Sequence, residues 1–215
     1  MLFPAILVLA AATAASKPSD AASFHDPLIG PLKDGWSWLR EDPKGWRADE
    51  KGLSVRAMKG TLWKSANDAR NVLLRAIPQG ASEYALEVTV TSQPAAGGEQ
   101  AGLIAYRDDD NYVKIVRESL EGKRWVVFGR EIDAKGEMIN RLPIDAESVR
   151  LRLVITPTKV SGYVLDDAAA GEWKQVGERD AAKGEQAMKV GLVAHGAPAD
   201  ADRWARFNDF QIAAP

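Results

Sequence analysis

The chain has 215 residues, with 28 Lys and Arg against 30 Asp and Glu, so its net charge is −2. Positively and negatively charged residues are interspersed, without a stripe of basic residues. This argues against nucleic acid and anionic membrane surfaces as partners and favours a neutral ligand. Cysteine is absent. That excludes a disulfide framework, a thiolate metal site, a cysteine nucleophile and an anchor on a lipidated cysteine.

The N-terminal segment has the features of an export signal. Residues 1–15 carry no charge, hold an apolar run over residues 2–12 and end in small residues that suit cleavage. The apolar run is about half of the roughly 20 residues that span a bilayer, so we expect a signal peptide, no membrane insertion, and a secreted or periplasmic protein. Residues 16–33, rich in Ser, Ala, Asp and Pro, are predicted to form a disordered tether. Residues 34–215 then form one domain.

Alternation of apolar and polar residues predicts β-strands along most of this domain. The clearest segments are residues 53–57, 84–90, 149–155 and 160–164, and further strand-like runs cover residues 71–77, 101–107, 112–118, 124–132, 188–195 and 204–212. Turn signals separate these runs, and no segment has a helical stripe, although residues 180–187 could form a short helical turn. We therefore predict an all-β fold, specifically a two-sheet antiparallel β-sandwich.

The segment from residue 99 to residue 118 reads as a hairpin around an acidic turn. Asp108 and Asp110 are candidate calcium ligands, because closely spaced carboxylates in a loop suit that ion. Asp and Asn also favour tight turns on their own account, and the glycine that gives a calcium loop its sharp bend is missing here. The turn is the preferred interpretation, with calcium as the alternative cofactor.

A second acidic group provides candidate catalytic residues. Sandwich-fold glycosidases use carboxylates in the pattern E-x-D-x-x-E or E-x-D-x-E, where one attacks the sugar and another donates a proton. Glu131 and Asp133 match the start of this pattern, but the third acid, Glu137, falls one residue beyond it, after a turn-like segment at residues 134–136. Glu131 and Asp133 are therefore the candidate pair for a hydrolase alternative.

The seven tryptophans are candidate sugar-stacking platforms, because an indole face packs well on the C–H face of a sugar ring. Tryptophan is also largely buried on average, so most of the seven should be core residues. Trp46, Trp63 and Trp125 are expected to be the more exposed ones. The two histidines, His25 and His195, are too far apart in sequence for a zinc motif.

A series of short blocks, in order, resembles a known family. They are residues 36–43 (WSWLREDP), 52–55, 71–75, 99–103, 110–114, 190–192 and 207–210 (FNDF). Together they resemble the concanavalin A-like β-sandwich at the C-terminus of family 43 β-xylosidases, and related secreted stand-alone domains of unassigned function. The resemblance covers roughly residues 34–212.

The resemblance implies a jelly roll that acts as an accessory domain, since the catalytic carboxylates of those enzymes lie on a separate propeller. It implies a saccharide-binding face, and polar or aromatic strand residues are then the candidate ligand contacts: Asn71, Arg75, Gln100, Tyr112, Lys114, Arg117 and Trp125. Their alternative roles are structural, in ion pairs and turns. The leading hypothesis is non-catalytic binding of a xylan-like or other polysaccharide. A glycoside hydrolase and a protein-interaction domain that docks on a separate enzyme are the alternatives.

Overall fold

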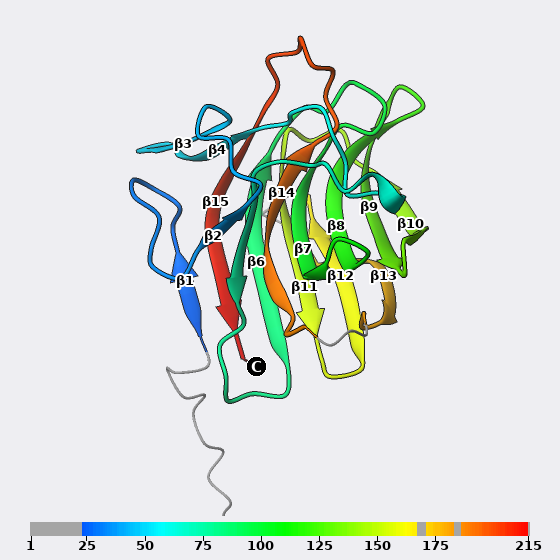
Figure 1. Cartoon of the computed structure of the whole chain (residues 1–215). Helices are drawn as coiled ribbons and strands as arrows, with labels where there is room; N and C mark the ends of the chain where they lie inside the picture. Colours follow the sequence, from blue (N-terminus) through cyan, green and yellow to red (C-terminus); the bar gives the residue numbers. More distant parts are fainter. Residues whose placement is uncertain (1–22, 167–170, 183–185, 215) are drawn as a thin grey trace, which may run out of the picture.

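The computed structural model describes residues 23–166, 171–182 and 186–214, and it consists of two antiparallel sheets packed face to face (Figure 1). One sheet has eight strands in the order β13-β12-β11-β6-β15-β4-β3, with β1 paired to β15. The other has seven strands in the order β10-β9-β8-β7-β14-β5-β2. The predicted all-β, two-sheet sandwich is confirmed.

The eight-stranded sheet consists of β1 (Phe24–Asp26), β3 (Trp46–Asp49), β4 (Gly52–Arg56), β6 (Tyr84–Thr91), β11 (Ser148–Ile155), β12 (Lys159–Leu165), β13 (Lys174–Asp180) and β15 (Trp204–Ala213). The seven-stranded sheet consists of β2 (Ser37–Leu39), β5 (Val72–Ala76), β7 (Gln100–Asp108), β8 (Asn111–Leu120), β9 (Lys123–Ile132), β10 (Lys135–Pro143) and β14 (Lys189–His195). A 3-10 turn, η2 (Lys64–Ala66), lies between β4 and β5. No helix in the described ranges is long and apolar enough to cross a membrane.

The main core lies between the sheets and follows from the alternation. In β6 every second residue is buried, from Tyr84 to Val90, and in β11 the same holds from Val149 to Ile155. From the seven-stranded sheet, Leu103, Ile115 and Phe128 enter the same core. The intervening residues of the eight-stranded sheet face outward, where Glu87 pairs with Arg150 and Arg152.

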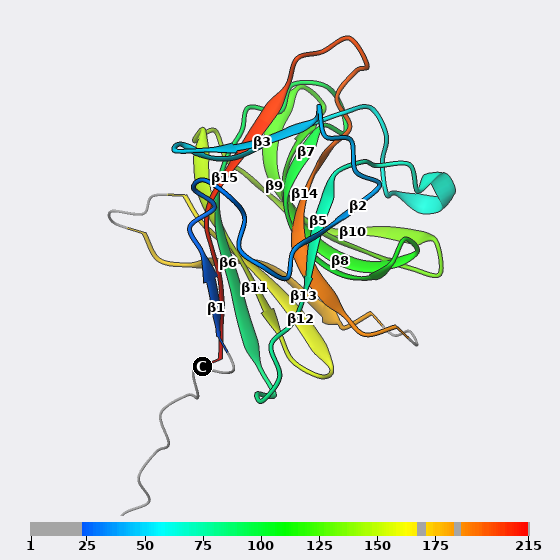
Figure 2. The same ribbon diagram turned by 60° about the vertical axis from the view of Figure 1, so that its left-hand side comes forward.

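The seven-stranded sheet is apolar on its outer face as well, which explains why β7 and β8 are buried almost throughout. A second hydrophobic cluster there includes Ile104, Val116 and Val127. It is covered by the connection from β4 to β5, residues 57–71, which we call the β4–β5 loop and which contributes Leu62 and Ala69. Figure 2 shows this loop, with η2, on the side of the seven-stranded sheet that faces away from the other sheet.

The predicted tether is wrong for its second half. β1 pairs with β15, which places His25 opposite Gln211, and Leu28 is fully buried in the main core. Asp26 is 1% exposed, and its carboxylate accepts hydrogen bonds from the Leu28 amide, the Lys33 amide and the Trp36 indole. Three hydrogen bonds on one buried carboxylate hold this segment in the fold. The predicted signal peptide lies outside the described residues.

The sequence patterns also missed some strands. β10 was expected to be partly a turn over residues 134–136, but the turn lies one residue earlier, at Asp133 and Ala134, whose φ angles are 50° and 58°. β10 therefore begins at Lys135. β13 is an edge strand, only one of whose residues is buried, so it lacks the apolar alternation that marks the inner strands. The helical turn suggested for residues 180–187 falls partly outside the described residues.

Candidate functional site

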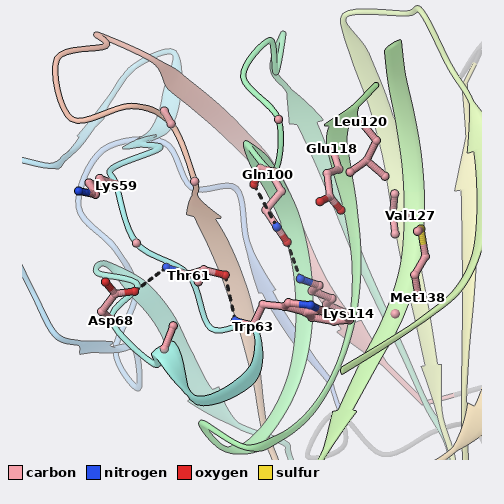
Figure 3. Close-up of a pocket in the computed structure, with 17 residues that line it drawn as sticks. Lys59, Thr61, Trp63, Asp68, Gln100, Lys114, Glu118, Leu120, Val127 and Met138 are labelled. Carbon is pink, nitrogen blue, oxygen red and sulfur yellow. Dashed lines mark hydrogen bonds between the residues drawn. The ribbon is translucent and has the colours of Figure 1, made fainter. Parts of the chain in front are cut away.

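A cavity of about 550 Å³ lies between the outer face of the seven-stranded sheet and the β4–β5 loop. Strands β7 to β10 form its floor, the β4–β5 loop forms one wall, and two short segments at residues 97–98 and 196–197 close one end. Its volume is in the range that proteins use for small-molecule ligands. The side chains that line it come from sequence positions far apart, and Figure 3 shows how they converge.

The register of the sheet places three polar residues on one face beside this cavity. Gln100 of β7 is opposite Glu118 of β8 on one side and opposite His195 of β14 on the other. Lys114 is four residues before Glu118 on β8, so the two share a face of the sheet. Gln100, Lys114 and Glu118 line the cavity.

Lys114 is the most unusual group at this site. Its side chain is 3% exposed, and its Nζ donates to Oε1 of Gln100 at 2.6 Å. In the described part of the chain, no carboxylate oxygen comes within 4 Å of this ammonium group. Burial lowers the pKa of Lys114, and the charges of Glu118 and Glu131 partly oppose that shift. The fold thus buries a cation and gives it a neutral amide as its partner.

Glu118 supplies a hydrogen-bond acceptor to the same cavity. Its side chain is half-buried, and burial raises its pKa, while the charge of Lys114 acts in the opposite direction. Lys114 and Glu118 together give the cavity a donor and an acceptor that are not joined in an ion pair. A ligand that carries both kinds of group can bond to both.

Trp63 forms the aromatic wall. It comes immediately before η2 in the β4–β5 loop, and its ring centroid is 5.0 Å from Nζ of Lys114, within cation–π range. The indole lies against Gly136 of β10, where an added Cβ would come within 2.5 Å of two ring carbons. Glycine at this position therefore leaves the space that the indole occupies.

Glu131 anchors the loop that carries Trp63. It is fully buried, and its Oε2 accepts hydrogen bonds from the Lys64 amide at 2.7 Å and from the Tyr112 hydroxyl at 3.0 Å. A second tie joins Asn67 Nδ2 to Asp110 Oδ1 at 2.8 Å. The β4–β5 loop is thus held to the ends of β8 and β9 by two carboxylates.

This anchoring predicts a contrast between Glu131 and Asp133. We expect Glu131→Ala to lower the free energy of unfolding by about 1–3 kcal/mol, because the buried Tyr112 hydroxyl and Lys64 amide lose their acceptor. Urea unfolding measures this loss, and hydrogen exchange of the Lys64 amide should accelerate. Asp133→Asn is the matched control, since Asp133 is exposed in a turn and should change stability by less than about 0.5 kcal/mol. Equal effects of the two substitutions would contradict the anchoring role.

With this geometry established, comparison with known proteins assigns the family. The family model for the β-xylosidase C-terminal concanavalin A-like domain matches residues 29–213. The chain belongs to this family. The match begins inside the segment predicted as a tether, in agreement with the burial of Leu28 just before it. A comparison with curated proteins finds no match.

Solved structures share the fold of this concanavalin A-like domain. The GH43 protein BlXynB from Bacillus licheniformis is 22% identical with a TM-score of 0.78, and the match covers 94% of this chain and 40% of that one. A xylan β-1,4-xylosidase from Bacillus halodurans C-125 is 20% identical with a TM-score of 0.74, covering 88% and 39%. The chain therefore spans about two fifths of the length of these enzymes. A functionally unknown protein from Saccharomyces cerevisiae is 16% identical with a TM-score of 0.65, covering 84% and 97%.

Two of the predicted ligand contacts, Gln100 and Lys114, line the cavity of this domain. Tyr112 is fully buried next to it and supports Glu131. Trp125 is on the same strand as the lining residue Val127, but the Arg141 guanidinium covers its ring at 4.3 Å, and its Nε1 donates to the Leu120 carbonyl at 3.2 Å. Trp125 is thus engaged within the protein.

The other three predicted contacts are corrected by the structure. Arg117 is three residues from Lys114 on β8, so it points to the opposite face, where it is 1% exposed and donates to the Ala146 carbonyl. Asn71 is 1% exposed, and its Oδ1 accepts from the Asp42 amide at 2.7 Å. Arg75 lies over the rings of Phe24 and Trp36, away from the cavity.

The acidic candidates also have structural roles. Oδ1 of Asp108 accepts from the Asp110 amide and from Asn111 Nδ2, which closes the hairpin turn, and Asp110 holds Asn67. No group of three or more metal-ligating side chains is found in the described ranges. Glu131 and Asp133 do not share a cleft, because Glu131 is buried under the β4–β5 loop and Asp133 is in an exposed turn. They cannot act as the paired carboxylates of the hydrolase alternative.

Sequence patterns missed part of the site. Trp63 was among the tryptophans expected to be exposed, and it is half-buried with the other six. Glu118 was not proposed, although its even spacing from Lys114 on one strand was the signal that would have found it. His195, considered only as a metal ligand, is 1% exposed beneath Gly60, a residue of the β4–β5 loop.

Proposed function

We propose that this chain is a secreted, non-catalytic carbohydrate-binding domain and that the cavity beside Trp63 is its saccharide site. The arrangement that supports this most strongly is an aromatic wall next to a buried donor and a half-buried acceptor, Lys114 and Glu118. A sugar ring has C–H faces that pack on an indole and neighbouring hydroxyls that donate and accept hydrogen bonds. The cavity offers a partner for each of these features.

Three further observations support a binding role. The near-neutral net charge of the chain suits an uncharged polysaccharide. The carboxylates expected for hydrolysis do not meet in a cleft. The family is that of the β-xylosidase C-terminal domain, and one protein with the same fold is a xylan β-1,4-xylosidase. The proposal of secretion rests on the sequence of residues 1–15 alone.

The proposal predicts that Trp63→Ala weakens saccharide binding at least tenfold, which corresponds to about 1.4 kcal/mol, because the stacking face is lost. Retardation in affinity gels containing xylan, arabinan, β-glucan or pectin identifies the polymer, and calorimetry then measures the affinity. Trp173→Ala is the matched control, because Trp173 is also half-buried but stacks with Arg152 of the eight-stranded sheet. If none of the four polymers retards the wild-type protein, the proposed function is wrong.

A further inference from the structure

The cavity has two chemically different ends. Gln100, Lys114 and Glu118 make one end polar, and the other is made by Leu120, Val127 and Met138. Figure 3 shows these apolar side chains on the far side of the polar group from the Lys59–Asp68 segment, with Trp63 extending from that segment toward Lys114. A sugar ring with hydroxyls on all sides would use the polar end and leave the apolar end unfilled.

The apolar end is built into the strands and stays open to solvent. Met138 is 48% exposed and, with Ile29 at 50%, is one of the two large hydrophobic residues that are exposed in the described residues. It is opposite Gly129 in the ladder between β9 and β10, so no side chain of β9 covers it there. The pairing is shifted by a bulge directly after Met138, between it and Asn140. Bulges often lie beside binding sites, where they re-aim side chains.

The composition of this end favours an aromatic group over an aliphatic one. An indole face stacks on a second aromatic ring, and the thioether of methionine makes favourable contacts with aromatic rings. Trp63 and Met138 both line the cavity. At about 550 Å³ the cavity is of the size that holds drug-sized ligands, which are larger than one sugar ring.

We propose, as a refinement that rests on the proposed function, that the cavity takes a sugar unit carrying an aromatic substituent, as in an aryl glycoside or an aromatic acyl ester. The sugar packs one face on Trp63 while its hydroxyls bond to Lys114, Gln100 and Glu118. The aromatic ring contacts the remaining part of the indole together with Met138 and Leu120. The substituent then adds at least tenfold to the affinity that the sugar alone provides.

The test compares ligands that differ only in the substituent. Methyl glycosides of xylose, arabinose, glucose and galacturonic acid are first ranked for binding to the full chain by ligand-observed NMR. The 4-nitrophenyl glycoside of the best sugar is then compared with its methyl glycoside by calorimetry. We expect the nitrophenyl glycoside to bind at least tenfold more tightly, and free 4-nitrophenol to bind more weakly than the nitrophenyl glycoside.

Met138→Gln tests whether the tighter binding of the nitrophenyl glycoside arises at the apolar end of the cavity. We expect this substitution to reduce the nitrophenyl advantage to threefold or less and to leave the affinity for the methyl glycoside unchanged. Ile29→Gln is the matched control, an equally exposed hydrophobic residue away from the cavity, and should leave both affinities as in the wild type. Circular dichroism confirms that both variants fold.

The outcomes separate this inference from the proposed function. Equal affinity for the two glycosides overturns the aromatic subsite and leaves saccharide binding standing. Tight binding of 4-nitrophenol by itself, or an advantage that survives Met138→Gln, also overturns the subsite as described. If none of the methyl or nitrophenyl glycosides binds, the proposed function itself fails.

Discussion

Lys114→Met is expected to weaken saccharide binding strongly and at the same time to make the protein more stable. The ammonium group is the buried donor of the cavity, and a hydrogen bond from a charged group to a ligand contributes about 1.5–3 kcal/mol. Its removal should therefore weaken binding by roughly ten- to hundredfold or more. Methionine retains a similar length and apolar stem, so contacts with the cavity floor are largely kept.

The gain in stability follows from the desolvation of the lysine. Burial lowers the pKa of Lys114, which means that the fold disfavours its charged form. Replacing a whole buried ion pair by apolar residues of similar volume is often neutral or stabilising by about 1–4 kcal/mol. Here the direct partner that is left behind is the neutral amide of Gln100 and not a charge. A residue that costs stability and supports binding is typical of a functional site.

Urea unfolding and calorimetry measure the two effects, and Lys123→Met, at an exposed position of β9, is the control that should change neither. The pH dependence gives a further readout. Because the folded pKa of Lys114 is below its unfolded value of about 10.5, the unfolded chain binds more protons between those two values, so wild-type stability rises with pH there. That rise should be absent in Lys114→Met. A variant that loses both stability and binding would indicate a structural lysine.

The second large effect is a loss of folding stability at acidic pH, and we expect it to arise from His195. This residue is 1% exposed, and neither ring nitrogen has a hydrogen-bond partner in the described part of the chain, although the Gly60 backbone lies close enough to favour protonation slightly. Burial, and to a smaller extent the charge of Lys114, lowers the pKa of His195 to about 3. The folded state therefore keeps this imidazole neutral at pH values where the unfolded chain is already protonated.

The direction in which stability changes with pH follows from proton linkage. Between the unfolded pKa of about 6.5 and the folded pKa of about 3, the unfolded state binds more protons, so stability falls as the pH decreases through this window. At about 1.4 kcal/mol per pKa unit, the loss attributable to His195 is on the order of 4 to 5 kcal/mol. Urea unfolding from pH 7 to pH 3 measures it.

Comparison of two histidine variants isolates this contribution. His195→Gln should remove most of the acid destabilisation, whereas His25→Gln should keep it, because the His25 side chain is 55% exposed and pairs with Asp209 at the surface. Most carboxylates keep the same surroundings in all three proteins and cancel in the difference. Asp209, which bonds to His25, is the exception in His25→Gln. A wild-type pH profile that matches that of His195→Gln would show that His195 is protonated in the folded state.

The main strands were predictable because their signal is local. Apolar and polar residues alternate in β6 and β11 because one face of each strand packs on the core and the other faces solvent. Both strands are where this pattern placed them. Edge strands such as β13 carry little of this signal, since they bury few side chains. β1 was taken for a tether because three residues are too few to show a period, and only its partner β15 and the buried Asp26 reveal it.

The site was less predictable than the fold. Lys114 and Arg117 are equally polar positions on the same strand, yet one enters the cavity and the other points into the sandwich, since three residues separate them. Trp63 is in a loop, where no period indicates direction. Its position depends on the anchor at Glu131 and on the absence of a side chain at Gly136.

By itself, the sequence determined that this protein is a two-sheet β-sandwich, with a hairpin over residues 99–118 that is apolar on both faces. Those properties depend on short-range alternation and on turn-forming residues, which neighbours along the chain specify. The tertiary structure alone decided which face of that hairpin lines the cavity. Register placed Gln100 beside Glu118, and the β4–β5 loop covered that face and enclosed Lys114 in a cavity, because such contacts join residues that are distant in sequence.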